Sequence, residues 1–478
     1  MVVSAAIDGF RRENKGVIMN QREKLGSRLG FILLSAGCAI GCGNVWKFPW
    51  MTGQNGGGGF VLVYLLCLLI LGLPVMTMEF SLGRASQVSP VKMLGKLQKP
   101  KHAWHVYGPF ALLGNIALMS FYTVVTGWIF YYFYKFLTGQ HETLRIITDA
   151  ATGEMTQNPF VNMITNPTLN VVMLAIVVVV GFGILCFNLQ GGLERVTKYM
   201  MAILFFLMIV LAIYSATLPG AAEGIKFYLL PDFSKINLSV VVAAMNQAFF
   251  TLSLGIGSMA IFGSYIDKER SLMGESVNVI LLDTFVALMA GMIMFPACST
   301  YGLELDAGPA LLFNTMATVF NEMGAVGRWI GTLFFLFMCF AALSTVLAVC
   351  ENIIAMVRDL TGWSRPKGSI ICGIGIFVLA LTTALGFSVI KFQPFAEGSA
   401  FLDFWDFIVS TNLLPLGSIC FAIFCTWKFG WGWDNFVAEA NEGRGLKVKR
   451  WMKPIFQFVV PAIALILYVY GLVTFPWH

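Results

Sequence analysis

Charged residues are scarce in this sequence, at 12% of 478 residues, whereas a soluble domain carries roughly 25%. Such a chain lacks the polar surface to face water on all sides. Hydrophobic residues make up 58% of it, and apolar runs of roughly 20 residues recur, each long enough to cross a hydrocarbon core of about 30 Å. We therefore expect an all-α polytopic membrane protein. The continuous runs do not fit the alternating pattern of a transmembrane β-barrel.

Motifs for metal-assisted or nucleophilic catalysis are also missing. The sequence has no C-x-x-C pair, and its four histidines, His102, His105, His141 and His478, show no ligand spacing. The ten cysteines fit small residues of a helical core. We therefore expect no enzyme activity. The net charge of +6 follows from basic loops, so no nucleic-acid partner is expected.

Apolar periodicity predicts eleven transmembrane helices, at residues 31–51, 57–83, 107–138, 170–188, 194–217, 239–265, 273–301, 327–358, 369–390, 402–428 and 455–474. Basic residues orient them, because Lys and Arg gather in cytoplasmic loops. With a cytoplasmic N-terminus, 24 of the 31 basic residues fall on the cytoplasmic side and 7 outside. We expect a multi-pass protein of the cell membrane with an extracellular C-terminus.

Two of these spans are interrupted by glycines at matching places. Span 1 contains Gly37, Gly41 and Gly43, and span 6 contains Gly255 and Gly257. Glycine also favours close helix packing, but paired broken helices in two five-helix halves are typical of inverted-repeat transporters. The expected organisation is a 5+5 inverted repeat with broken helices 1 and 6. It consists of a cytoplasmic segment (1–30), a first repeat (31–217), an inverted second repeat (239–428) with an extracellular lid (307–324), and a cytoplasmic loop with the eleventh helix (429–478).

The first interrupted stretch, GCAIGCGNVWKFP at residues 37–49, offers polar groups that lipid does not satisfy. An unwound segment survives at this depth only where protein buries it or where it lines a cavity. Its free carbonyls, with the amide oxygen of Asn44, suit a hard cation. Its free N–H groups suit a carboxylate. This stretch is predicted to be a recognition loop with a cation face and an anion face.

Several stretches together resemble a known family. They are REKLGSRLGFILLSAGCAIGCGNVWKFP, NGGGGF, LPVMTMEFSLGR, SFYTVVTGW, NQAFFTLSLGIG and FAALST, in this order. The chain resembles the neurotransmitter:sodium symporter family over about residues 22–475, and most closely its bacterial amino-acid transporters, which have the leucine-transporter fold. The resemblance implies symport of an amino acid with sodium by alternating access.

Two sodium ions are implied by the same resemblance. The first would be bound by the Ala39 carbonyl, Asn44, Thr251, Asp283 and the carboxylate of the substrate. The second would be bound by the carbonyls of Gly37, Ile40 and Ala341 and the hydroxyls of Ser344 and Thr345. Taken alone, these two hydroxyls would more often bond back to their own helix, which is the alternative interpretation.

Asp283 lies within a predicted span, where a carboxylate is costly and by default marks a functional site. Many family members carry asparagine here and use a nearby chloride. With two sodium ions and a zwitterionic substrate bound, the site has a net charge of +1 if this residue is aspartate and +2 if it is asparagine. We therefore expect chloride-independent transport, with a merely structural aspartate as the alternative. Glu79 is a second intramembrane carboxylate, and the resemblance implies that it braces the break of span 6.

The implied substrate site uses both broken helices. Backbone groups near Ala39, Cys42 and Gly43 and the Tyr122 hydroxyl would hold the α-carboxylate, and carbonyls around Phe250 and Ser253 would hold the ammonium. The implied side-chain pocket consists of Leu118, Tyr122, Phe250, Ile256, Thr345 and Val349. It offers no counter-charge, so a neutral, mainly hydrophobic L-amino acid is expected.

Two gates complete the expectation. Outside, Lys47 would pair with Asp406, with Asp403 as an alternative partner, or would only extend to the membrane interface. Family members usually carry arginine where Lys47 stands, and lysine lacks the bidentate fork. Inside, Arg22 would pair with Asp359. A tryptophan usual in this N-terminal segment is replaced by Leu25.

Other functions fit the sequence less well. A channel would need a continuous polar pore, and an enzyme would need a nucleophile or a metal cluster. A sodium-dependent amino-acid-binding sensor of the same fold stays open, as does a sodium-independent amino-acid exchanger. The expected partners are the amino acid, two Na⁺ and the lipid bilayer, and we expect a monomer or a weak homodimer.

Overall fold

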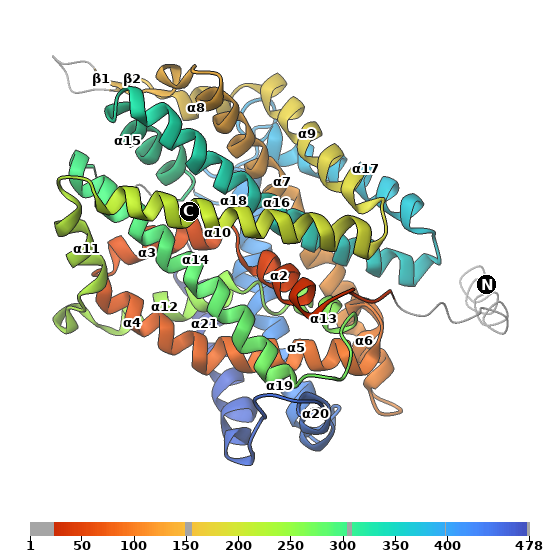
Figure 1. Cartoon of the computed structure of the whole chain (residues 1–478). Coiled ribbons are helices and arrows are strands. Elements are labelled where there is room, and N and C mark those ends of the chain that lie inside the picture. Colours follow the sequence, from red (N-terminus) through yellow and green to blue (C-terminus); the bar gives the residue numbers. More distant parts are fainter. Residues whose placement is uncertain (1–22, 149–154, 304–307, 397, 476–478) are drawn as a thin grey trace.

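The computed structural model describes residues 23–148, 155–303, 308–396 and 398–475. Figure 1 shows long helices lying side by side in one bundle, with α20 at its lower edge. Over the described residues the all-α architecture is confirmed, apart from one short antiparallel pair, β1 (Ile147–Thr148) and β2 (Met155–Gln157). The expected all-helical membrane fold is therefore present.

The helices of the first half alternate with short π- or 3₁₀-helical segments, labelled η. They are α2 (Arg28–Ala39), η1 (Gly43–Lys47), α3 (Phe48–Gln54), α4 (Gly58–Cys67), η2 (Leu68–Gly72), α5 (Leu73–Ser86), α6 (Pro90–Leu97), η3 (Trp104–Val106), α7 (Tyr107–Leu137), η4 (His141–Leu144), α8 (Pro159–Ile164), α9 (Pro167–Leu185), η5 (Leu189–Glu194), α10 (Arg195–Ala216), α11 (Ala221–Leu229) and η6 (Phe233–Lys235).

The second half continues in the same way. Its elements are α12 (Leu238–Thr251), α13 (Ser258–Gly263), α14 (Leu272–Tyr301), η7 (Leu311–Met316), α15 (Ala317–Glu322), α16 (Ala325–Thr361), α17 (Arg365–Ala384), α18 (Phe401–Asp406), η8 (Phe407–Leu413), α19 (Leu414–Thr426), α20 (Trp433–Ala440), η9 (Arg450–Met452), η10 (Ile455–Val459) and α21 (Val460–Val473).

Nine helices among the described residues are long and apolar enough to cross a membrane, or ten if the bent pair Arg28–Ala39 and Gly43–Gln54 is one span. The expected count of eleven is not confirmed. The difference lies at the sixth expected span, 239–265, which the structure divides into α12, with 14 residues, and α13, with 6 residues. Each piece is too short to cross a bilayer, which takes about 20 residues.

The first span breaks where the glycines are. Helix α2 begins after Ser27, whose hydroxyl accepts a hydrogen bond from the Gly30 N–H, and ends at Ala39. Ile40 then adopts an extended conformation (φ −69°, ψ 110°), and the chain resumes a helical course with a bend of 58°. The break therefore interrupts the helical hydrogen bonding of this span, as the sequence predicts.

The sixth span breaks more sharply. Between α12 and α13, three residues have positive φ: Ser253 (49°), Gly255 (101°) and Gly257 (75°). At Gly255 a Cβ atom would also lie 2.1 Å from the Leu414 carbonyl oxygen. Only glycine fits this combination of backbone angle and close approach.

Helix α16 lies inside the bundle and packs against α7, α10 and α2. Helices α9, α10 and α14 expose large apolar side chains, among them Val179, Phe206 and Leu281, on surfaces that face hydrocarbon in a membrane protein. The expected lid at 307–324 contains η7 and α15, which are helical. Helix α15 lies against η7 and α16; residue 307 lies outside the described residues. Helix α16 thus contacts α2, the first half of the broken span, and its Thr345 lies close to Gly41 at the break.

Candidate functional site

The two broken spans meet beside α7 and α16. At the break of span 1, the Cys42 N–H donates a hydrogen bond of 3.0 Å to the Tyr122 hydroxyl of α7. A Cβ atom on Gly41 would lie 2.4 Å from that hydroxyl oxygen and 2.7 Å from the Thr345 Oγ1 atom of α16. Glycine is needed here because the backbone approaches both side chains too closely for any other residue.

A cavity of about 50 Å³ lies between these elements. Eight of the ten substrate-site residues implied by the family resemblance line it: Ala39, Cys42, Gly43, Leu118, Tyr122, Phe250, Ser253 and Thr345. The lining also includes Gly41, Trp46, Phe121, Val125, Thr251, Val409 and Leu414, and none of these fifteen described residues is charged. In this conformation the cavity holds water-sized molecules, so an amino acid needs some of these side chains to move.

Two implied pocket residues lie elsewhere. Ile256 lines a second cavity, on the far side of the break, because the left-handed turn at Gly255 directs the chain away from the central cavity. There its side chain packs against Gly114 of α7. Val349 lies one helical turn beyond Thr345 in α16, is fully buried, and is not among the residues that line the central cavity. Neither residue lines the central cavity in this conformation, and the expected role of both in substrate binding stays a prediction.

The residues of the first implied sodium site lie together. The Asn44 side-chain amide donates hydrogen bonds to the Thr251 hydroxyl (2.9 Å) and to a carboxylate oxygen of Asp283 (2.8 Å). The Thr251 hydroxyl lies 3.2 Å from the other carboxylate oxygen. All three side chains are buried. The Asn44 amide oxygen itself accepts a hydrogen bond of 2.9 Å from the Gly41 N–H. The Thr251 hydroxyl and the Asp283 carboxylate supply oxygen atoms that fit a hard monovalent cation such as Na⁺.

The residues of the second implied site converge on Thr345. Its Oγ1 atom lies 3.0 Å from the Ile40 carbonyl oxygen, 3.3 Å from that of Gly37 and 3.4 Å from that of Ala341. Three carbonyls and a hydroxyl from two helices thus point at one place. The neighbouring Ser344 hydroxyl donates a bond of 2.9 Å back to Ala341 in its own helix. That back-bond is the alternative predicted from the sequence.

This chemistry suits sodium better than a transition metal. Within the described residues, no group of three or more His, Cys, Asp or Glu side chains could hold a metal ion. The donors at both places are carbonyl, amide, hydroxyl and carboxylate oxygens, which soft metals do not select. Ala39, whose carbonyl is implied in the first sodium site, lines the central cavity.

Glu79 of α5 holds the break of span 6. One carboxylate oxygen accepts a hydrogen bond from the Gly255 N–H (2.6 Å), and the other accepts one from the Met259 N–H (3.1 Å). On the other side of the break, the Tyr107 hydroxyl donates to the Gly255 carbonyl (2.7 Å), and the Asn115 amide donates to the Ile256 carbonyl (2.9 Å). The bracing role expected for Glu79 is confirmed by these contacts.

Lys47 lies above the central cavity. Its ammonium sits 3.5 Å from the centre of the Phe250 ring, and it lines a cavity of about 140 Å³ together with Asp406. Asp406 accepts a hydrogen bond of 2.6 Å from the Ser410 hydroxyl. The alternative partner, Asp403, is exposed and accepts a bond of 2.8 Å from the Ala400 N–H at the start of α18. The arrangement therefore favours Asp406 as the residue that faces Lys47.

The opposite gate is only partly described. Arg22 lies outside the described residues, and Asp359 accepts a bond of 2.7 Å from the Ser89 N–H. Leu25, which replaces the usual tryptophan, donates its N–H to the Tyr265 carbonyl (3.3 Å). The N-terminal segment is thus anchored through its backbone at this residue.

An ion-pair cluster on the same side was not expected. Glu23 pairs with Arg358 (2.9 Å) and Arg365 (3.2 Å), and Arg365 also pairs with the buried Glu351 (2.5 Å). Burial of Glu23 works against its ionised form, but the neighbouring Arg365 and Arg358 outweigh this and keep its pKa below the usual value. Sequence spacing carries no signal for this cluster, because Glu23 and Arg358 are 335 residues apart.

The central cavity also has walls that the sequence did not assign. Trp46 follows the first break, Phe121 and Val125 flank Tyr122 on α7, and Val409 and Leu414 come from η8 and α19. For Val125 a signal existed, since it lies three residues after Tyr122 and thus on the same helical face. The π-helical course of η8, which sets the direction of Val409, has no comparable signature.

Comparison with known proteins identifies the family. The model of the sodium:neurotransmitter symporter family matches residues 22–166 and 156–478. An uncharacterized sodium-dependent transporter of Haemophilus influenzae is 33% identical over 460 residues, covering 95% of this chain and 98% of that protein. A sodium-dependent nutrient amino acid transporter of Drosophila melanogaster is 23% identical, covering 95% and 78%.

A solved structure agrees with these matches. The crystal structure of MhsT in complex with L-phenylalanine has a TM-score of 0.82 and 36% identity, and the match covers 94% of this chain and all of MhsT. The chain belongs to the sodium:neurotransmitter symporter family and is a multi-pass, sodium-dependent membrane transporter.

Proposed function

We propose that this protein imports a neutral, mainly hydrophobic L-amino acid together with two sodium ions, without a need for chloride. The observation that carries the proposal is the central cavity between the two broken spans. Its walls are apolar and uncharged, and the Cys42 N–H and the Tyr122 hydroxyl stand at one end. An α-carboxylate suits these two groups, and an apolar side chain suits the remaining walls.

The substrate class is also supported by relatives. MhsT was crystallised with L-phenylalanine, and the Drosophila relative is described as a nutrient amino acid transporter. A pocket of this kind separates hydrophobic amino acids only weakly, because one methylene is worth about 1–3 kcal/mol. The proposal therefore names a class of substrate and not one amino acid.

Coupling to two sodium ions follows from the two groups of oxygen ligands. The first, around Asn44, Thr251 and Asp283, borders the cavity through Thr251. The second, around Thr345, joins the first broken span to α16. Two ions moving inward at about 100 mV release roughly 2 × 2.3 kcal/mol. This energy sustains a substrate gradient of roughly a thousandfold.

Chloride independence follows from the charge of Asp283. The carboxylate is fixed and buried beside Asn44, so it reduces the charge of the loaded site from +2 to +1. In the proposed cycle sodium favours the outward-open state, and substrate closes Lys47 over Asp406. The gate at Asp359 then opens, with the N-terminus cytoplasmic, the C-terminus outside, and the chain a monomer or a weak homodimer.

The test is uptake of labelled amino acids into proteoliposomes, with Na⁺ or K⁺ outside and chloride or gluconate as the anion. We expect concentrative uptake of a hydrophobic amino acid that needs Na⁺ and proceeds equally in gluconate. Sodium-dependent binding without uptake would instead identify a sensor. Equal uptake in K⁺ would indicate an exchanger and would remove both sodium sites.

A further inference from the structure

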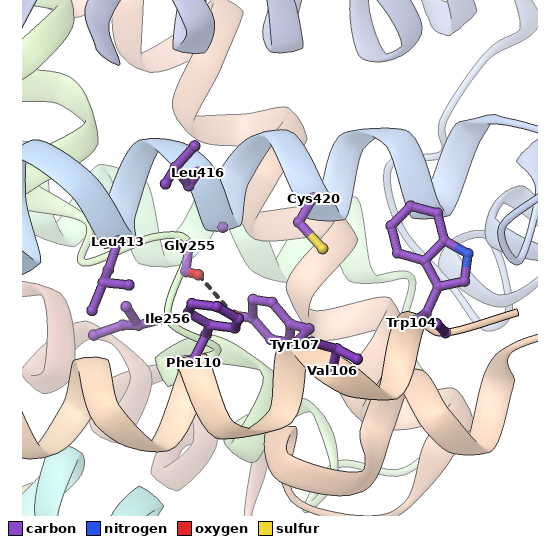
Figure 2. A pocket seen from close by; sticks show the side chains of 11 residues that line it. Trp104, Val106, Tyr107, Phe110, Gly255, Ile256, Leu413, Leu416 and Cys420 are labelled. Carbon is purple, nitrogen blue, oxygen red and sulfur yellow. Dashed lines mark hydrogen bonds between the residues drawn. The ribbon is translucent and has the colours of Figure 1, made fainter.

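A second cavity lies on the far side of the span 6 break. It has a volume of about 280 Å³ and shares no lining residue with the central cavity. Figure 2 shows its two long walls, one from Trp104, Val106, Tyr107 and Phe110 and the other from Leu413, Leu416 and Cys420. Gly255 and Ile256 form its inner end. We refer to these residues as the α7–α19 groove.

The mouth of the α7–α19 groove is apolar and open. Val106, Phe110 and Leu416 have 50%, 52% and 42% of their surface exposed. In a membrane protein, exposed apolar side chains on two neighbouring helices face lipid. The volume is slightly below the roughly 300–1,000 Å³ of small-molecule pockets, which suits one segment of a hydrocarbon chain.

One edge of the groove is basic. Lys96, Lys99 and Lys101 are exposed shortly before Trp104, and Lys428 is exposed on the facing loop. The two loops are joined, because the Lys99 ammonium donates to the Lys428 carbonyl and the Trp104 indole N–H donates to the Phe429 carbonyl (3.2 Å).

The two segments that carry these lysines contain no acidic residue. The sequence has no Asp or Glu between Glu79 and Glu142, nor between Asp406 and Asp434. Trp104 also stacks on Phe429 at a centroid distance of 6.1 Å, as an interfacial anchor does. A cationic edge therefore adjoins an apolar slot at the depth where a lipid headgroup meets its acyl chains.

We propose that the α7–α19 groove binds an anionic phospholipid, with one acyl chain between Phe110 and Leu416 and the phosphate beside Lys99, Lys101 and Lys428. Basic pockets between transmembrane helices are suited to anionic headgroups. A zwitterionic lipid would fill the apolar slot equally well but would gain little from the lysines. The basic edge therefore gives the groove a preference for a lipid of net negative charge.

At the inner end of the groove, this lipid would contact the unwound segment of span 6 that also borders the central cavity. The chain terminus reaches Gly255 and Ile256, whose carbonyls are held by Tyr107 (2.7 Å) and Asn115 (2.9 Å). Ser253, two residues before Gly255, lines the central cavity. A bound lipid and a bound substrate thus contact opposite sides of one unwound segment.

The test uses phosphatidylglycerol with a photoreactive diazirine on one acyl chain, in phosphatidylcholine proteoliposomes. We expect peptides covering residues 104–110 and 413–420 to be labelled at least fivefold more than peptides of the lipid-facing helix α9. Unlabelled phosphatidylglycerol should compete, and added phosphatidylcholine should not. Even labelling of all lipid-facing helices, or equal competition by both lipids, would overturn the proposal.

Two pairs of variants sharpen this test without relying on transport. Leu416→Trp fills the slot and should lower labelling of 104–110 at least fivefold, whereas Leu66→Trp, at a similarly exposed leucine of α4, should not. The double variant Lys99→Gln, Lys101→Gln should need a severalfold higher concentration of unlabelled phosphatidylglycerol to halve the labelling. The control double variant Lys447→Gln, Lys449→Gln should need the same concentration as the original protein. Thermal unfolding in detergent verifies that each variant is folded. Unchanged labelling in a folded Leu416→Trp protein would refute the site.

Discussion

Asn44 and Asp283, 239 residues apart in the chain, meet through a hydrogen bond of 2.8 Å between the side-chain amide and the carboxylate. Both side chains are fully buried. A buried carboxylate beside a neutral amide stays ionised at little cost only when a cation is close. This pair therefore links the break of span 1 to α14 directly, beside the sodium site that we propose there.

Replacing Asp283 by asparagine removes the fixed negative charge. We expect the Asp283→Asn transporter to need at least tenfold more Na⁺ for half-maximal uptake and to become stimulated by chloride, because a mobile anion then supplies the missing charge. Uptake in chloride and in gluconate measures both effects. The exposed Asp434→Asn change serves as the control, and a variant indifferent to both ions would contradict the charge argument.

Replacing Thr345 by valine keeps the shape of the side chain and removes its oxygen. Because Oγ1 lies 3.0 to 3.4 Å from three carbonyl oxygens, we expect the Na⁺ concentration for half-maximal uptake to rise at least tenfold. Ser344→Ala is the matched comparison, since the Ser344 hydroxyl donates its hydrogen bond to Ala341 in its own helix. Its effect should stay below threefold. Equal effects of the two changes would assign the hydroxyls a common role.

Gly41→Ala tests the close approach at the first break. The added methyl group would lie 2.4 Å from the Tyr122 hydroxyl, so we expect binding of labelled substrate to fall at least a hundredfold. Gly183→Ala in α9 is the control, because nothing lies within 4 Å of its added atom. Scintillation binding in detergent measures both proteins. Full binding by the Gly41→Ala protein would show that the break moves away from Tyr122.

Glu79→Gln tests how the break of span 6 is held. The glutamine retains one acceptor oxygen but leaves either the Gly255 or the Met259 N–H without its partner, at a cost of about 1–3 kcal/mol. We expect thermal unfolding at a temperature several degrees lower and uptake reduced at least tenfold. Glu269→Gln, at an exposed position, should change neither. A stable but inactive Glu79→Gln protein would place the carboxylate in transport and not only in bracing.

Lys47→Met tests the outer gate. The change removes the charge that faces Asp406 and lies on the Phe250 ring, while its side chain still covers the cavity. We expect equilibrium substrate binding within threefold of the original protein and a maximal uptake rate lowered at least fivefold. Lys47→Arg should preserve uptake because the guanidinium pairs with carboxylates. Loss of binding in both variants would make Lys47 a substrate residue.

Much of the fold follows from features that operate within single helices. Apolar runs of about 20 residues predict the spans, and glycines at 37–43 and 255–257 predict the two breaks, because both signals are local. Glu79 was also predictable in kind, since a carboxylate at this depth needs partners and an unwound segment supplies them.

Other features of the site could not be predicted, because they depend on side-chain directions and long-range contacts that the local sequence does not determine. Ile256 was expected in the substrate pocket, yet the positive φ at Gly255 turns its side chain towards Gly114. The count of eleven spans is not confirmed for a related reason, since the sixth expected span is divided into α12 and α13 and neither is long enough alone. The cluster of Glu23, Arg358 and Arg365 forms between distant segments, and pairing of this kind is set by the packed bundle.

The grip on Gly255 has a consequence for motion. Its N–H is bound to Glu79 and its carbonyl to Tyr107, so the two peptide groups of this residue are held by α5 and α7. The break of span 1 is held by other helices. Its Cys42 N–H bonds to Tyr122 of α7, its Ile40 carbonyl accepts a bond from Thr345 of α16, and its Gly43 carbonyl accepts one from Gln247 of α12. Because Glu79 ties the second break to α5, we expect α13 to stay beside α5 during the cycle. Spin labels on α13 and α5 should therefore keep their separation.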